Sequence, residues 1–241
     1  MSKNNIPILM YHSTELMPKS TVMRGMHVPP NRFYFQMLLL KILGFKGLSM
    51  RELQPYLKGK KSDKVVGITF DDGYLNNLKN AAPVLKKFNF SATCFIVSEC
   101  IGRTNIWDKP KGINQRPLMS NDEIRKWLAS GMDIGAHTQT HVDLTSVSKE
   151  KAAKEINRCK DDLEDKFDIS IVDFCYPFGK FDDDVCNQVK MAGFSSAVTM
   201  IRGRANKQFN ELKLPRIPIT YHTLPHLFLI KILSKYEDKR S

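Results

Sequence analysis

Two adjacent aspartates, Asp71 and Asp72, follow a run of apolar residues in the stretch VVGITFDDGYLNN, residues 65–77. Two like charges at the end of a core strand repel each other, so a cation or a proton must neutralise one of them. A second strand-like run, MDIGA, ends at His137, and His141 follows four residues later. Two imidazoles and one carboxylate form a ligand set that leaves coordination positions open for water and substrate. The remaining carboxylate is then free to act as a base.

Neither motif is specific when it stands alone. Two histidines four residues apart often only cap or pack, and an aspartate after a strand can cap the helix predicted at Tyr74–Lys87. An aspartyl nucleophile of the phosphatase kind is disfavoured, because Gly73 stands where that chemistry usually has a second carboxylate. The two motifs therefore carry weight only if the fold brings them together.

Strand-like runs alternate with helical segments along the chain, which predicts an α/β protein with a mainly parallel sheet or barrel. The predicted strands are Ile6–Tyr11, Val65–Phe70, Thr93–Val97, Met132–Ala136, Ile171–Tyr176, Ser195–Thr199 and Leu214–Ile219. Helices are predicted between them with N-caps at Asn31, Ser120, Ser148 and Asp182. Working residues of such folds gather at the carboxyl ends of the strands, so the aspartates, the histidines and the turn Tyr176–Gly179 are expected at one end.

Composition narrows the class of protein. The 241 residues, 42% of them hydrophobic, suit one large domain or two small ones. Five cysteines without a C-x-x-C pair favour reduced thiols, and we recognise neither an export signal nor a membrane-spanning run, so a cytoplasmic protein is expected. The net charge of +12 fits general solubility or an anionic partner. No helix-turn-helix, finger or RNP-type motif accompanies it, so no nucleic-acid partner is expected.

Taken together, the motifs resemble the NodB-homology polysaccharide deacetylases, which are family 4 of the carbohydrate esterases. The resemblance is carried by TFDDGY and HTQTH, and by AAPVLKKFNFSATCFIV, LASGMDIGAHT and FCYPFGKF around them. It covers nearly the whole chain and implies one domain, residues 1–241, folded as a distorted (β/α) barrel with about seven parallel strands. The implied activity is metal-dependent removal of an N-acetyl group from an N-acetylhexosamine unit of a cell-surface polysaccharide or its precursor. A carbohydrate-binding or regulatory relative with little turnover is the alternative.

The resemblance also implies roles for the motif residues. It assigns Asp71 as the general base and Asp72, His137 and His141 as ligands of one divalent metal ion. Zinc is expected from two nitrogens and one oxygen, with cobalt, nickel or manganese as alternatives. Thr138 would orient the histidine loop through a hydrogen bond.

The third motif, YPFG, implies two further catalytic groups. The backbone N–H of Phe178 would donate to the negative oxygen that forms during the reaction. Many family members carry an arginine near the start of this motif, whereas this chain has Cys175. Arg216, in LPRIPI, is expected to take the place of that arginine beside the base, and an ordinary surface ion pair is the alternative.

The general acid that protonates the leaving amine is expected to be His12, in ILMYHS. The chain resembles the circularly permuted poly-N-acetylglucosamine deacetylases, in which the acid histidine lies in an N-terminal Tyr-His pair. The resemblance therefore implies His12 as the acid. Histidine suits this task because it exchanges a proton near neutral pH. His222 and His226, in TYHTLPH, are the alternatives, because both lie near the end of a predicted strand.

The expected partner is a carbohydrate, either free or carried on phosphate or lipid. A phosphorylated or lipid-linked substrate is favoured by the net charge and by a basic loop that contains Arg103, Lys109, Lys111 and Arg116. Residues 221–241 predict a basic amphipathic helix that either packs on its own domain or contacts the inner membrane face. Trp107 is expected to stack on a sugar or to anchor its loop. The pattern does not predict an oligomeric state.

Overall fold

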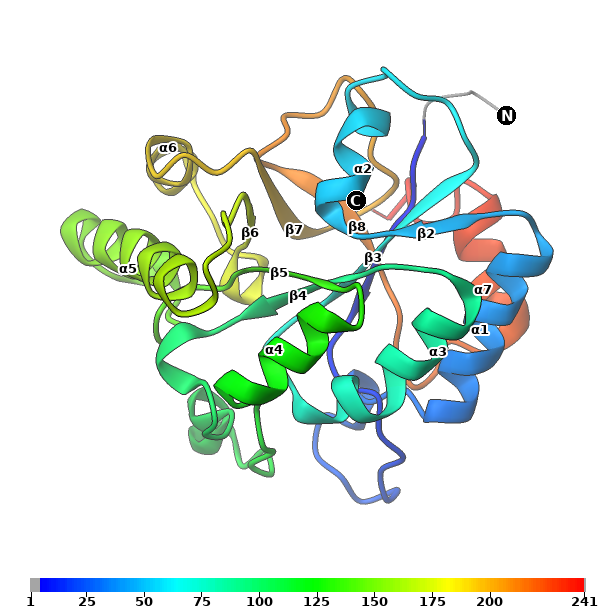
Figure 1. Ribbon diagram of the computed structural model, residues 1–241, viewed down its shortest axis with the longest axis horizontal. Helices are drawn as coiled ribbons and strands as arrows, with labels where there is room; N and C mark the ends of the chain where they lie inside the picture. Colours follow the sequence, from blue (N-terminus) through cyan, green and yellow to red (C-terminus); the bar gives the residue numbers. More distant parts are fainter. Residues whose placement is uncertain (1–4, 241) are drawn as a thin grey trace.

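Parallel strands closed into a barrel form the centre of the computed structural model, which describes residues 5–240 (Figure 1). The eight strands are β1 (Ile8–Tyr11), β2 (Lys46–Leu48), β3 (Val65–Phe70), β4 (Thr93–Ile96), β5 (Asp133–Ala136), β6 (Asp173–Cys175), β7 (Ser196–Arg202) and β8 (Leu214–Pro218). Their order is β1-β8-β7-β6-β5-β4-β3-β2, and β1 also pairs with β3. The seven strands other than β2 therefore form a closed ring, which confirms the expected (β/α) barrel.

Strand β2 and the helix after it, α2 (Met50–Leu57), were not predicted. Lys46–Leu48 pairs with the first half of β3, while β4 pairs with its second half, so β2 extends the sheet beside the ring. A Cβ on Gly47 would lie 2.6 Å from the Phe90 ring, which explains a glycine in so short a strand. Ser49 caps α2 by accepting a hydrogen bond from the Glu52 N–H at 3.3 Å.

Helices surround the barrel, as Figure 1 shows. They are α1 (Pro30–Ile42), α3 (Ala82–Phe88), α4 (Asn121–Ala129), α5 (Lys149–Phe167), α6 (Asp183–Met191) and α7 (Pro225–Leu233). The predicted caps Ser120, Ser148 and Asp182 are confirmed, because each side chain accepts a hydrogen bond from its first turn. The predicted cap Asn31 is wrong: α1 begins at Pro30, whose fixed φ angle suits a first helical position. The helix predicted at 74–87 is interrupted by a π-helical turn at Asn77–Ala81.

Two hydrophobic clusters hold the barrel in shape. The larger one lies between the strands and the surrounding helices, and Phe33, Phe70 and Trp127 are among its fully buried members. The smaller one joins residues near the amino ends of the strands, such as Ile8 and Val65, to the buried face of α2. Its strand members come from six of the seven ring strands and reach Cys175 at the carboxyl end of β6, so this cluster lies in the barrel interior. The carboxyl ends of the strands remain available for polar groups.

The C-terminal helix is shorter than the predicted span of 221–241, because α7 ends at Leu233. Its apolar side packs on the domain through Phe228 and Ile232. Lys231 is buried rather than part of a solvated basic face: its ammonium donates to the Pro218 carbonyl at 2.9 Å and pairs with Glu237. None of the helices within residues 5–240 has the length and apolarity needed to cross a membrane.

Candidate active site

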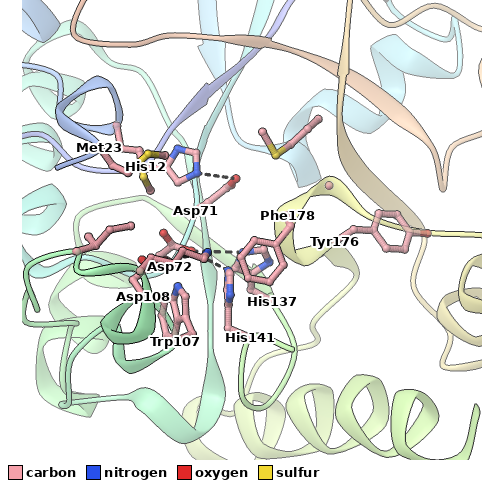
Figure 2. Close-up of a pocket in the computed structure, with 15 residues that line it drawn as sticks. His12, Met23, Asp71, Asp72, Trp107, Asp108, His137, His141, Tyr176 and Phe178 are labelled. Atoms are coloured by element: carbon pink, nitrogen blue, oxygen red, sulfur yellow. Dashed lines mark hydrogen bonds and ion pairs between the residues drawn. The ribbon is translucent and has the colours of Figure 1, made fainter. Parts of the chain in front are cut away.

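A pocket of about 190 Å³ opens at the carboxyl ends of the strands, and Figure 2 shows the side chains around it. Four polar groups at its base directly follow strands: His12 follows β1, Asp71 and Asp72 follow β3, and His137 follows β5. The remaining wall consists of Met23, Met26, Trp107, Asp108, Lys111, Ile113, His141, Tyr176, Phe178, Gly179 and Met200. The barrel thus brings the two sequence motifs together in one pocket.

Asp72, His137 and His141 form a buried cluster whose ligand atoms all lie within 4.8 Å of one another. One Asp72 carboxylate oxygen, Oδ1, lies 3.5 Å from Nε2 of His137 and 3.3 Å from Nε2 of His141. Burial raises the pKa of Asp72, but hydrogen bonds from the two imidazoles outweigh it and hold the pKa well below its ordinary value. Burial lowers the pKa of His141, which favours the neutral ring that a metal requires.

The hydrogen bond on the far side of His137 tests whether the cluster fits a cation. Nδ1 of His137 lies 2.7 Å from the carbonyl oxygen of Cys175. A carbonyl oxygen only accepts, so Nδ1 carries a hydrogen. Burial lowers the pKa of His137, but Cys175 and Asp72 beside it outweigh burial and hold the pKa well above its ordinary value, so Nε2 holds a proton toward Asp72 where no cation is bound. A metal at Nε2 would take the place of that proton. Two acceptors that face each other in a buried site need a cation or a proton between them. The donor set and its orientation therefore fit a divalent metal.

The backbone around the cluster is strained, and side chains hold it in place. Asp72, Thr138 and His141 have φ angles of 73°, 64° and 61°, a region that residues other than glycine seldom adopt. The Thr138 hydroxyl accepts a hydrogen bond from the His141 N–H at 3.0 Å, where the sequence placed an orienting threonine. Glu155 of α5 accepts from the Thr140 N–H at 2.9 Å and from its hydroxyl at 2.7 Å. Glu155 was not predicted, because nothing distinguishes it from the other acids of its helix.

Asp71 belongs to a second, separate interaction, an ion pair with Arg216. The guanidinium donates two hydrogen bonds to the carboxylate, at 2.7 Å and 2.8 Å, and both side chains are buried. Arg216 also donates to the Thr199 carbonyl at 2.8 Å and to Cys175 Sγ at 3.3 Å. Burial raises the pKa of Asp71, but the Arg216 guanidinium outweighs burial, and the net pKa is below its ordinary value. The burial of both partners rules out the alternative of a surface ion pair.

Among the three histidines considered for the acid, only His12 lies in the pocket. Its Nε2 is 3.9 Å from Oδ2 of Asp71, and its side chain is 20% exposed (Figure 2). The Asn77 side-chain amide donates to the His12 carbonyl at 2.7 Å, which ties the end of β1 to the segment after the aspartates. His222 and His226 are exposed and do not line the pocket.

Two aromatic rings enclose His141, as Figure 2 shows. Trp107 stacks on the imidazole at a centroid distance of 4.3 Å, and Phe178 meets it edge-on at 4.6 Å. The Lys111 ammonium lies 4.4 Å from the centre of the Phe178 ring. Trp107 therefore anchors its loop on a metal-ligand candidate while it lines the pocket. Sequence reasoning missed the methionines Met23, Met26 and Met200, because a methionine carries no signal that separates a pocket wall from a core.

Comparisons with known proteins give consistent results. A family model described as polysaccharide deacetylase matches residues 58–197. The poly-beta-1,6-N-acetyl-D-glucosamine N-deacetylase of Staphylococcus aureus (strain MRSA252) is 27% identical over 218 residues, which cover 86% of this chain and 73% of that protein. The solved structure of Streptococcus pyogenes deacetylase PplD in complex with acetate has a TM-score of 0.83 and 25% identity, with 96% of this chain and 99% of that chain covered. BC0361, a polysaccharide deacetylase from Bacillus cereus, has a TM-score of 0.80 and 26% identity over 95% of this chain and 69% of that one.

Proposed function

The chain belongs to the polysaccharide deacetylase family, and we propose that it is a metal-dependent hydrolase that removes the N-acetyl group from an N-acetylhexosamine unit. The unit would be part of a cell-surface polysaccharide or of its precursor. A relative named as a deacetylase of poly-N-acetylglucosamine and a similar structure that contains acetate support this choice of acyl group and sugar.

The observation that carries the proposal is the separation of the two aspartates. Asp72 faces the histidines, while Arg216 binds Asp71 through both carboxylate oxygens and leaves it outside the cluster. The lowered pKa of Asp71, which the guanidinium causes against the effect of burial, keeps the carboxylate ionised. An ionised carboxylate beside an electrophilic site is the arrangement that a general base requires.

Each remaining group has one task in the proposed reaction. Asp71 accepts a proton from the attacking water, and His12, 3.9 Å from that carboxylate, donates a proton to the leaving amine. The backbone N–H of Phe178 stabilises the oxyanion, from a residue that lies against His141 in the pocket wall. Arg216 positions Asp71 and holds its charge.

Asp72, His137 and His141 would hold the divalent ion, for which zinc is our first choice and cobalt, nickel or manganese the alternatives. When bound, such an ion supplies Lewis acidity, which polarises the acetyl carbonyl and makes the attacking water more acidic. Trp107 and Phe178 shield one of these imidazoles from bulk water, which strengthens electrostatic interactions at the site.

We further propose that the protein works in a reducing compartment such as the cytoplasm, on a carbohydrate that carries phosphate or lipid. All five cysteines are free and buried, which supports this compartment. Lys111 in the pocket wall, and the basic loop to which it belongs, support an anionic substrate.

The test is amine release from an oligomer of β-1,6-linked N-acetylglucosamine by protein loaded with zinc, cobalt, nickel or manganese. The Asp71→Asn variant should bind metal and oligomer like the wild type but lose release by at least about a hundredfold, because the base is gone. The Asp72→Ala variant should lose metal as well. A protein that only binds carbohydrate would release no amine with any metal, and Asp71→Asn would then leave the binding of the oligomer unchanged.

A further inference from the structure

Exposed apolar side chains are concentrated around the mouth of the pocket. Within residues 5–240, thirteen large hydrophobic side chains are exposed, and seven of them lie on segments that border the pocket. We call these seven the apolar rim: Leu16, Val22, Met23, Ile106, Phe178, Met200 and Ile201. Soluble monomers usually scatter such residues singly, and a contiguous group marks an interaction site.

The loops that carry the rim are held side by side. Nη2 of Arg116 lies 3.1 Å from Sδ of Met17, which joins the loop 101–118 to the loop 14–26. Figure 1 shows both loops, green and blue, at the lower end of the molecule. Met23 of one loop and Trp107 of the other line the same pocket. The rim therefore forms one surface around the pocket.

Basic residues accompany the apolar ones on these loops. Loop 101–118 contains four basic residues and one acid, and that acid, Asp108, is buried and pairs with Lys111. Lys19, Arg103 and Lys109 are exposed on the same two loops. Apolar side chains flanked by exposed cations match a surface that offers hydrocarbon and negative charge together.

The types of side chain in the rim indicate whether a sugar, a second copy of the chain or a lipid bilayer binds there. Six of the seven rim residues are aliphatic side chains or methionines, and only Phe178 is aromatic. The flat face of a sugar ring stacks on a flat aromatic face, which these loops do not offer at Leu16 or Val22. A second copy of the chain would bring the same exposed cations face to face, which costs free energy. Aliphatic side chains at loop tips instead gain by entering the acyl boundary of a bilayer.

We propose that the apolar rim docks on an anionic lipid bilayer. Leu16, Val22 and Ile106 enter the boundary between headgroups and acyl chains, and exposed cations such as Lys19 and Arg103 lie against lipid phosphates. The pocket then opens toward the membrane. If the proposed function also holds, on which this consequence rests, the sugar reaches the pocket as the headgroup of a lipid-carried glycan.

Docking through the rim differs from docking through the C-terminal helix. α7 buries Phe228 and Ile232 in its own domain. Of the large apolar side chains in α7 and at its N-cap, Leu224 and Ile230 are the exposed ones, each with 44% of its surface accessible. Substitutions in these two places therefore separate the two surfaces.

The test is co-sedimentation of the full chain with vesicles of phosphatidylcholine mixed with phosphatidylglycerol, and with vesicles of phosphatidylcholine alone. We expect binding to the mixed vesicles that falls as salt rises. The triple variant Leu16→Asp/Val22→Asp/Ile106→Asp should weaken it by at least about tenfold, because each side chain loses its transfer into the apolar boundary. Lys19→Glu/Arg103→Glu/Lys109→Glu should weaken it by a similar factor through charge alone.

Matched controls are Ile42→Asp and Met191→Asp, which place the same charge at sites that are 71% and 86% exposed and outside the rim. These and Leu224→Asp/Ile230→Asp should bind vesicles like the wild type. The proposal is overturned if the wild type does not bind, if the triple rim variant binds equally well, or if the rim variants only dissociate a dimer. Amine release from the soluble oligomer, measured in parallel, tests the proposed function separately, because the triple variant leaves every pocket-lining residue intact.

Discussion

Replacing Arg216 by methionine should strongly lower the free energy of unfolding, because the arginine side chain is buried in the barrel beside a charged carboxylate. Arg216 is 1% exposed and donates two hydrogen bonds to Asp71, at 2.7 Å and 2.8 Å. Methionine fills a similar volume but leaves a buried carboxylate without its cation. The Thr199 carbonyl loses its guanidinium donor as well.

The magnitude follows from these contacts. A hydrogen bond to a charged group contributes about 1.5–3 kcal/mol, so the two bonds to Asp71 account for about 3–6 kcal/mol. Breaking a buried ion pair by removal of one partner costs about 3–5 kcal/mol, which agrees. The double variant Arg216→Met/Asp71→Asn removes both charges, so its cost should be smaller than the sum of the two single variants by about 2 kcal/mol.

The assay is urea unfolding followed by circular dichroism, with the free energy of unfolding extrapolated to water for the wild type, both single variants and the double variant. Arg216→Lys is the matched control: it keeps the charge but cannot form the forked pair, and should fall between wild type and Arg216→Met. A change below about 1 kcal/mol for Arg216→Met, or equal stabilities for Lys and Met, would refute the reasoning, because a buried charge would then tolerate the loss of its partner.

Three further predictions concern other parts of the fold. Burial raises the pKa of Asp173 to about 6, so the folded state favours the protonated acid, and the free energy of unfolding should fall by about 3 kcal/mol as pH rises from about 4 to above 6. Asp173→Asn should abolish that fall in urea titrations at several pH values. Trp107→Ala should weaken zinc binding by about tenfold in calorimetry, since His141 loses its stacked support, whereas Trp107→Phe should retain most of the affinity. Gly47→Ala should cost about 1–3 kcal/mol of unfolding free energy, because the new Cβ meets the Phe90 ring at 2.6 Å.

The sequence could predict the barrel and the cluster because both depend on local pattern. Strands β1, β3 and β5 are short, mainly apolar runs, and a polar site residue comes directly after each of them: His12, Asp71 and His137. In a parallel barrel, residues that directly follow the strands all lie at the same end of the barrel, at the carboxyl ends of the strands. The spacing of Asp72, His137 and His141 along the chain thereby becomes proximity in space.

The features that sequence reasoning missed depend on tertiary contacts. Strand β2 has three residues, one of them Gly47, so its strand propensity is weak and its pairing with β3 decides its conformation. Asn31 looked like a cap, but α1 begins at Pro30, because the fixed φ angle of proline suits the first helical position. The mouth of the pocket could not be predicted either, since a methionine such as Met23 shows its place only when the loops are assembled.

Cys175 on β6 and Arg216 on β8 share the interior of the closed barrel, and each limits what the other can be. Inward-facing side chains from all strands share the same small interior, so a guanidinium can approach the Asp71 carboxylate from β6 or from β8. Nη2 of Arg216 lies 3.3 Å from Sγ of Cys175, which shows that the two positions compete for the same space. With the arginine on β8, residue 175 must be small, and cysteine satisfies that limit while its carbonyl still accepts the hydrogen bond from His137. Because Arg216 on β8 reaches Asp71 after β3 and contacts Cys175 on β6, the ion pair depends on the closure of the barrel rather than on either strand alone.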